Sequence, residues 1–174
     1  MSIDEVIGRF DWGRLRTYVG AGEMLPALLR GLLGAASRED ARRLSDAVEH
    51  IVVPVASGPC EATAPVATVL VASLGGATPA GRTAALGLLA DVGAAEICGP
   101  PHEQIGPFDL GEIRACVAAG FEHYVAILRA GAAEVDLRIC VDLVELATEH
   151  DPGLIPAADA ALAAIRNNER GPAA

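Results

Sequence analysis

One stretch of the chain decides the fold, residues 61–93, which read EATAPVATVLVASLGGATPAGRTAALGLLADVG. The pattern predicts two helices, because an apolar run over 66–74 and a second helical run over 82–92 flank a turn that is rich in glycine. Pro65 is compatible with a first helical turn, where its missing N–H would have no partner in any case. Such a pair cannot bury both of its apolar faces alone. Further helices are therefore expected to pack against it.

The same spacing occurs earlier in the chain. Pro26 and Arg43 are 17 residues apart, as are Pro65 and Arg82, and the two units are offset by 39 residues. A third unit has no matching proline, although Arg138 follows its turn. Two-helix units at this interval are typical of HEAT and armadillo repeats. The sequence therefore predicts an all-α fold, a HEAT-like α-α superhelix of about three to four helical hairpins in a right-handed stack.

We expect a single domain over residues 1–174, divided into segments by the positions of proline and glycine. The segments are an N-terminal capping segment (1–22), repeat 1 (23–53), repeat 2 (61–93), an inserted loop (94–112), repeat 3 (113–149, with helices over 113–130 and 137–149) and a C-terminal helix (154–168). Ser37 is expected to cap the second helix of repeat 1. The capping segment is expected to form a short helix over 10–18, in which Trp12 anchors the open end of the core.

Composition limits the class of protein. Apolar residues make up 52% of the chain and aromatic residues only 3%, so the core is expected to consist of packed Leu, Val and Ala. The formal net charge of -10 disfavours nucleic acid as a partner, because phosphates require a basic surface. The uncharged run 62–81 has the length of a membrane span, but its prolines, glycines and hydroxyl residues argue against a membrane partner. With no leader-like pattern at Met1, the expected location is cytoplasmic.

The cysteines and histidines do not form a recognisable metal or catalytic pattern. Four widely spaced cysteines without a C-x-x-C pair predict buried free thiols in a reducing compartment. The histidines share no metal-ligand spacing, and no G-x-S-x-G, P-loop or dinucleotide motif is present. We therefore expect no metal and no cofactor, and a non-catalytic protein more readily than an enzyme.

Several segments resemble the HEAT-repeat proteins that are common in actinobacterial genomes. The most specific is Glu61-Ala62-Thr63-Ala64-Pro65-Val66, and the similarity extends over most of residues 10–150. The other matching segments are Trp12, Tyr18-Val19-Gly20, Pro26-Ala27-Leu28-Leu29, Gly58, Pro79, Arg82-Thr83-Ala84-Ala85-Leu86, Arg114-Ala115-Cys116 and Glu134-Val135-Asp136-Leu137-Arg138. Residues 51–58 depart from the family's usual Asn-Ile-x-His-Gln-Gly stretch, and Cys60 replaces an aromatic residue. The resemblance implies the fold and a scaffold or binding role.

Partners of HEAT-like stacks usually bind the concave face, which the second helix of each pair lines. On those helices the candidate binding residues are Arg43, Asp46, Glu49 and His50, then Arg82, and then Arg138, Asp142, Glu145 and Glu149. The last four share one helix face and predict either an acidic groove for a basic partner or a solvated surface. The three arginines are expected to form a ladder between repeats, with Asp40, Asp136 or Asp142 as partners. Glu61 and His102 are further candidates, with Glu61 also explained as a first-turn carboxylate.

These observations support three hypotheses on function. The first is a protein-binding or scaffold module with a concave acidic face, including an immunity-type or regulatory protein that neutralises a basic target. The second is a small-molecule-binding, biosynthetic or self-resistance protein, with a pocket under the loop 98–111 that Cys60, His102, Phe108 and Tyr124 would line. The third is an oligomerising element built on the Ala-rich helix 157–165. For the inserted loop 94–112, a functional role and disorder are equally compatible with the sequence.

Overall fold

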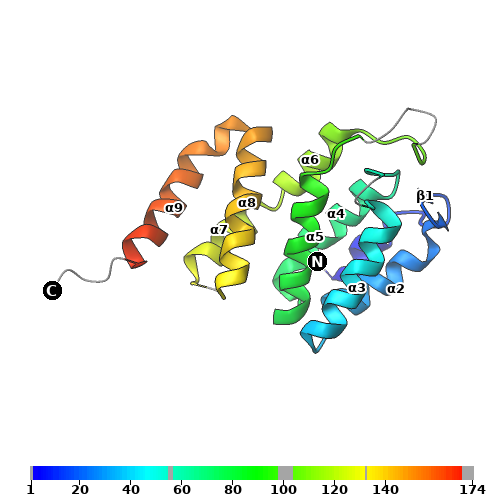
Figure 1. Ribbon diagram of the computed structural model, residues 1–174, viewed down its shortest axis with the longest axis horizontal. Coiled ribbons are helices and arrows are strands. Elements are labelled where there is room, and N and C mark those ends of the chain that lie inside the picture. The colour runs from blue at the N-terminus through cyan, green and yellow to red at the C-terminus, as the bar shows by residue number, and fades with distance from the viewer. Residues whose placement is uncertain (1, 55–56, 98–103, 132, 170–174) are drawn as a thin grey trace.

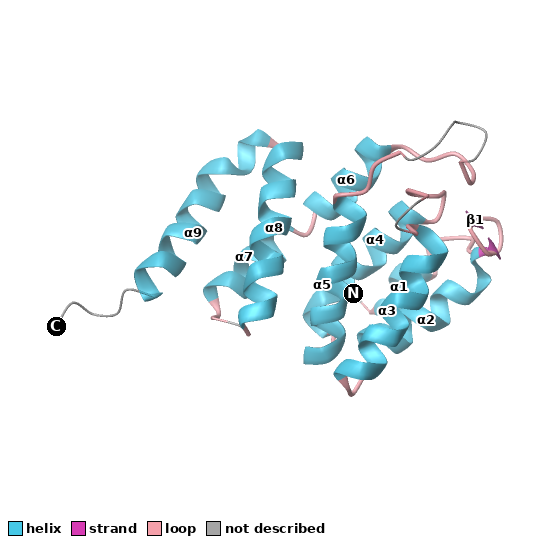
Figure 2. Ribbon diagram, viewed as in Figure 1, coloured by secondary structure: helices cyan, strands magenta, loops and turns pink. Residues whose placement is uncertain are grey.

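The computed structural model describes residues 2–54, 57–97, 104–131 and 133–169, and the side chains of the last helix up to residue 163. Helices form most of this part of the chain (Figure 1, Figure 2). The α-helices are α1 (Ile3–Ile7), α2 (Leu25–Leu33), α3 (Arg38–Val52), α4 (Thr63–Ser73), α5 (Pro79–Gly93), α6 (Leu110–Ala118), α7 (Phe121–Arg129), α8 (Glu134–His150) and α9 (Ile155–Glu169). The prediction of an all-α fold is therefore confirmed.

The helices lie in two layers. In one layer α3 contacts α5 and α5 contacts α8, and in the other α2 contacts α4 and α4 contacts α6. α1 packs on α4, while α7 and α9 extend the stack beyond α8. Figure 1 shows the resulting elongated shape, with β1 at one end and α9 at the other. The two layers bury a core of Leu, Val and Ala side chains that runs from Val6 to Ala161.

α5 and α8 run in the same direction. Near their N-terminal ends Arg82 Nη2 lies 3.3 Å from Asp136 Oδ2. Near their C-terminal ends, a Cβ added at Gly93 would lie 3.0 Å from a methyl group of Leu146. Parallel packing therefore brings the C-terminal ends of these two helices to the same edge of the layer.

Short polar side chains define where the helices begin. Ser37 Oγ accepts a hydrogen bond from the Asp40 N–H at 3.0 Å, which confirms Ser37 as the N-cap of α3. Thr78 caps α5 in the same way and also donates to the carbonyl oxygen of Ala35 at 2.6 Å. Asp109 caps α6. These bonds satisfy N–H groups that have no partner inside the helix.

Gly81 allows α5 to approach the end of α2. A Cβ at this position would lie 2.5 Å from the carbonyl oxygen of Leu32 and 2.6 Å from that of Leu33. The adjacent Thr78 N–H donates to the Leu33 carbonyl oxygen at 2.9 Å. The two helices therefore meet through backbone atoms, and any side chain at residue 81 would separate them.

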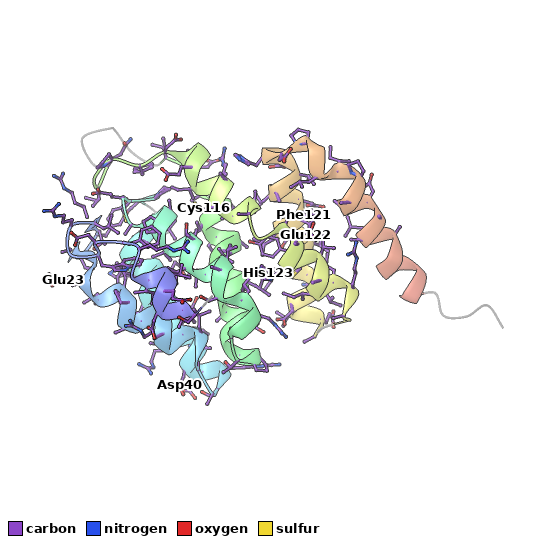
Figure 3. The ribbon with its side chains drawn as sticks, turned by 180° about the vertical axis from the view of Figure 1, so that it is seen from behind. Glu23, Asp40, Cys116, Phe121, Glu122 and His123 are labelled. Carbon is purple, nitrogen blue, oxygen red and sulfur yellow. The ribbon has the colours of Figure 1, made fainter. Side chains whose placement is uncertain are left out.

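The third unit contains three helices where two were expected. The expected helix over 113–130 is wrong, because the chain breaks between α6 and α7 at Gly120. The Tyr124 hydroxyl donates to the carbonyl oxygen of Val117 at 2.8 Å and lies directly beside Gly120, where a Cβ would overlap it. The helix α8 also begins three residues before the expected start at 137. Figure 3 shows the break between Cys116 on α6 and Phe121 on α7.

The N-terminal segment also differs from expectation. Residues 10–18 were expected to be helical, but the chain forms α1 and then a small antiparallel hairpin, β1 (Arg16–Thr17) with β2 (Gly20–Ala21). Gly20 turns the hairpin with a φ of 114°, which L-residues rarely adopt. Trp12 is 6% exposed, and its indole N–H donates to the Ile7 carbonyl oxygen at 2.8 Å. It therefore anchors this segment to the core.

The thiols of the described part of the chain are unbridged. Cys60 and Cys140 are buried and Cys116 is half-buried, whereas Cys98 lies outside the described residues. In the same part of the chain, no helix combines the length and the apolar character that crossing a bilayer would require.

Candidate functional site

A groove lies between α3 and α5. It has a volume of about 290 Å³, and its lining includes Arg38, Asp46, Glu49, Ala84, Gly87 and Asp91. Ser45 Oγ of α3 lies 3.5 Å from the Ala84 carbonyl oxygen of α5, and Glu49 shares the groove with Asp91 further along both helices, so these two helices are also parallel. Small side chains form the floor on α5, where a Cβ added at Gly87 would meet no atom within 4 Å.

The groove continues along the C-terminal ends of the helices. A second hollow of about 350 Å³ shares Glu49 and Asp91 with it and adds Glu96. A third hollow, between α5, α6 and α8, shares Glu96 and adds Glu149 together with Arg114 and His150. We call the four carboxylates Glu49, Asp91, Glu96 and Glu149 the acidic edge. It also receives the partial negative charge of the C-terminal ends of α3, α5 and α8.

Two carboxylates of the acidic edge, those of the half-buried Glu49 and the exposed Asp91, have raised pKa values. Burial raises the pKa of Glu49 above its ordinary value, and the negative charges of Asp91 and Asp46 raise it further. Desolvation also raises the pKa of Asp91. Neither side chain forms an ion pair with any other described residue. A bound cation would relieve both effects, because an opposite charge favours the ionised carboxylate.

The other candidates on α3 are less directly connected with this groove. Asp46 lines it, but its Oδ2 lies 3.7 Å from Arg42 Nη1 in an exposed pair. Arg43 is exposed, and its Nη2 lies 3.2 Å from Asp40 Oδ1 one turn earlier in the same helix. His50 is exposed and is not among the lining residues.

The expected arginine ladder holds at only one position. Arg82 joins α5 to Asp136 of α8, as expected for a bridge between repeats. Arg43 pairs within α3, and Arg138 Nη2 lies 3.8 Å from Glu134 Oε1 within α8. Among the described residues, the ion pairs of these two arginines stay within their own helices, so the repeated position does not create a repeated contact.

The acidic stripe on α8 is exposed. Arg138, Asp142, Glu145 and Glu149 all have exposed side chains. Glu149 belongs to the acidic edge, so this residue connects the stripe to the groove.

Two residues of the acidic edge, Asp91 and Glu96, were not among the candidates predicted from the sequence. Asp91 lies in the last turn of the mainly apolar helix α5, and only the position of α3 shows that it adjoins Glu49.

Glu61 joins separate segments of the chain. Its Oε2 accepts a hydrogen bond from the Arg16 N–H at 3.2 Å, and its own N–H donates to the Ile105 carbonyl oxygen at 3.0 Å. Gly106, with a φ of 75°, packs against the same side chain. Glu61 precedes α4, whose first turn contains no acidic residue, so the expected role of Glu61 as a first-turn carboxylate is wrong. Its carboxylate accepts from the Arg16 N–H instead. His102 lies outside the described residues.

Two residues of the expected small-molecule pocket, Cys60 and Tyr124, are fully buried. Cys60 is 0% exposed, and its thiol lies 3.8 Å from the Ile51 carbonyl oxygen. Tyr124 is also 0% exposed and bonds to Val117 in α6. A side chain that lines a ligand pocket must present some accessible surface to it. These two residues therefore do not line a pocket under the loop.

Two of the described thiols, Cys60 and Cys140, are poorly suited to nucleophilic chemistry. Burial raises the pKa of Cys60, and burial together with the negative charge of Asp136 raises the pKa of Cys140 to about 12. The thiolate is the reactive form, so both groups are unreactive at neutral pH. Within the described residues, no group of three or more His, Cys, Asp or Glu side chains is arranged to hold a metal ion.

Comparison with known proteins adds no assignment. No protein-family profile, no curated protein and no solved structure matches the chain. The interpretation of the site therefore rests on its geometry and charge.

Proposed function

We propose that the protein is a binding module whose groove between α3 and α5 accepts a cationic segment of a protein partner. The observation that carries this proposal is the pair of ionisable side chains Glu49 and Asp91, which lie in one groove, have raised pKa values and lack ion-pair partners among the described residues. A lysine or arginine side chain placed between them would offset their mutual repulsion. The small floor at Gly87 would leave room for the partner's backbone.

We further infer that the helices form a HEAT-like superhelix of the kind that the resemblance to actinobacterial HEAT-repeat proteins implies. Three features support this. The helices form two layers, α3 and α5 are parallel, and Ser45 Oγ of α3 lies 3.5 Å from the carbonyl oxygen of Ala84, its equivalent 39 residues later. Binding along the face of the second helices is the usual use of such stacks, and neutralisation of a basic target is one form of it.

The test measures binding of a labelled helical peptide that carries lysines one turn apart on an alanine background. We expect saturable binding to the full chain that Glu49→Gln with Asp91→Asn weakens by about tenfold, because two charge-assisted contacts are lost. The matched control is Glu112→Gln with Glu122→Gln, which removes the same charge from exposed positions on α6 and α7. If both double variants lost the same affinity for the peptide, the loss would follow from net charge alone. That result would contradict specific binding in the groove.

A third variant separates the groove from the stripe on α8. Asp142→Asn with Glu145→Gln removes two exposed carboxylates that lie outside the three hollows. If this variant loses more affinity than the Glu49 and Asp91 variant, the binding face is the stripe and the proposal for the groove fails.

A further inference from the structure

A separate cleft lies where α1, the end of α2, the end of α4 and the start of α5 meet. Its volume is about 430 Å³, and its lining includes Ile3, Arg30, Leu33, Ser73, Gly76 and Thr78. It shares no lining residue with the groove between α3 and α5. Figure 3 views the molecule from behind, with α1 in front of the helices on which it packs. The volume falls within the range of small-molecule sites.

One buried polar group in this cleft has no partner. The Ser73 hydroxyl oxygen is inaccessible to solvent and forms no hydrogen bond with the described residues. A helical serine can donate to the carbonyl one turn earlier, as Thr68 Oγ1 does to Ala64 O at 2.9 Å in the same helix. Leaving a buried hydroxyl unpaired is unfavourable, so this group has unused capacity to donate and accept. The Thr78 hydroxyl is by contrast fully used as the cap of α5.

Arg30 supplies further donors to the same cleft. Its Nε donates to Asp4 Oδ1 at 2.7 Å, an exposed pair that fixes the orientation of the guanidinium group. A guanidinium has five N–H bonds, and the terminal nitrogens of Arg30 have no partner among the described residues. The remaining lining is apolar, from Ile3, Leu33 and Ala72. The cleft thus combines an apolar surface with the accessible donors of Arg30, next to the buried and unpaired hydroxyl of Ser73.

We propose that this cleft binds a small amphiphilic molecule with a short apolar chain and a terminal oxygen acceptor, either a carboxylate or a neutral carbonyl. The chain would contact Ile3, Leu33 and Ala72, and the acceptor would receive hydrogen bonds from the free N–H groups of Arg30. The Ser73 hydroxyl would add a further hydrogen bond after a change of rotamer that turns it into the cleft, where it gains the partner that it lacks. The proposal is independent of the groove and of its protein partner.

Hexanoate and hexanamide are suitable probes, because they share a chain and differ in the charge of the acceptor. Amide signals in ¹H–¹⁵N spectra of the full chain report where each binds. We expect saturable shifts at Gly34, Ser73 and Gly76 and unchanged signals at Gly87 in the groove. Affinity for hexanoate about tenfold above that for hexanamide assigns a carboxylate ligand, and equal affinity assigns a neutral carbonyl.

Two adjacent glycines give a matched pair of variants. A Cβ at Gly76 would meet no atom within 4 Å, so a side chain can start at this position. Gly76→Phe places an aromatic ring beside the cleft and should weaken both probes by at least about tenfold. Gly75 is equally exposed, does not line the cleft, and a Cβ there would only touch His123 Cε1 at 4.0 Å. Gly75→Phe should therefore bind both probes as the unmodified chain does.

Ser73→Ala provides a second test that leaves the packing intact. It removes only the unpaired hydroxyl and should weaken both probes about fivefold, because one hydrogen bond to the ligand is lost. The proposal is overturned if neither probe gives saturable shifts at the cleft up to its solubility limit. It is equally overturned if Gly76→Phe and Ser73→Ala bind the probes unchanged.

Discussion

Arg82 of α5 and Asp136 of α8 form an ion pair across the boundary between the second and third units, with Nη2 3.3 Å from Oδ2. Asp136 is 1% exposed and also accepts a hydrogen bond from the Thr83 hydroxyl at 2.5 Å. The Arg82 Nε is buried without a partner among the described residues. The Asp136 carboxylate is therefore the main group that compensates for partial burial of the guanidinium.

Asp136→Ala is expected to lower the free energy of unfolding by about 2–3 kcal/mol, because it leaves Arg82 without its counter-charge. The value lies below that for a fully buried pair because about one third of the Arg82 side chain (32%) is exposed. Urea unfolding followed by circular dichroism measures it. Arg138→Ala breaks the exposed pair with Glu134 and should change the same quantity by less than about 0.5 kcal/mol. Similar values for both variants would contradict a structural role for the Arg82 pair.

Two glycines of α5 should respond in opposite ways to the same substitution. Gly81→Ala is expected to destabilise the fold by about 2 kcal/mol, because the new Cβ would overlap the backbone of α2. Gly87→Ala is expected to stabilise it by about 0.8 kcal/mol, since alanine is the better helix former and its Cβ meets nothing. Thermal unfolding of the two variants side by side measures the difference. A stable Gly81→Ala variant would mean that α2 and α5 are further apart.

Stability should depend on pH through Glu49 and Asp91. Their pKa values are raised in the folded state, so folding is favoured where both are protonated, below the ordinary carboxyl pKa, and this contribution is lost as pH rises through the raised values. Glu49→Gln with Asp91→Asn should therefore unfold at higher urea than the unmodified chain at pH 7, with the difference vanishing near pH 4. Glu112→Gln is the control. If the stability difference between the double variant and the unmodified chain grew as the pH fell, its pH dependence would have the opposite sign. That result would contradict the raised pKa values of Glu49 and Asp91.

Under the proposed function, the same two groups should also determine how peptide binding depends on pH. A cationic peptide would bind the ionised carboxylates, so its affinity should fall as pH decreases through the raised pKa values of Glu49 and Asp91. Titrations of the labelled peptide between pH 4 and pH 8 follow this loss. Affinity that stays constant down to the ordinary carboxyl range would show that these residues do not contact the peptide.

The buried thiols should resist alkylation in the folded protein. Cys60 and Cys140 are inaccessible and have raised pKa values, so iodoacetamide at pH 8 should modify them only after unfolding. Cys116 is half-buried and should react at an intermediate rate. Peptide mass spectrometry after timed labelling, with and without urea, gives the rate for each residue. Rapid labelling of Cys140 in the folded chain would indicate that α8 opens locally.

Local signals were sufficient for the class of fold and for the first two units. Apolar periodicity, the cap at Ser37 and the prolines near helix starts predicted α2 to α5, because these features act within one turn of the helix. The break at Gly120 was missed because alanines precede it, and because the Tyr124 hydroxyl that packs against Gly120 and bonds to Val117 comes from the following helix. The N-terminal hairpin pairs two residues per strand, too few to give an alternating pattern.

The residues of the candidate groove could be named from the sequence only in part. Asp46 and Glu49 were candidates because the second helix of a HEAT-like pair usually lines the concave face, and both line the groove on α3. Helical spacing could not place Asp91 beside Glu49, since that proximity depends on how α5 packs against α3. The role of Glu61 also depends on distant partners, Arg16 and Ile105, which no local pattern connects with it.

The parallel orientation of α3, α5 and α8 affects how a partner would arrive as well as how it would bind. Three helix ends of the same polarity, together with four carboxylates, produce a field that extends beyond the surface for about one Debye length, roughly 8 Å at physiological salt. A positively charged protein that diffuses past this edge is turned toward it before any atom touches. Encounter therefore becomes faster in dilute buffer and slower as salt is added, while the rate of departure is set by the short-range contacts in the groove.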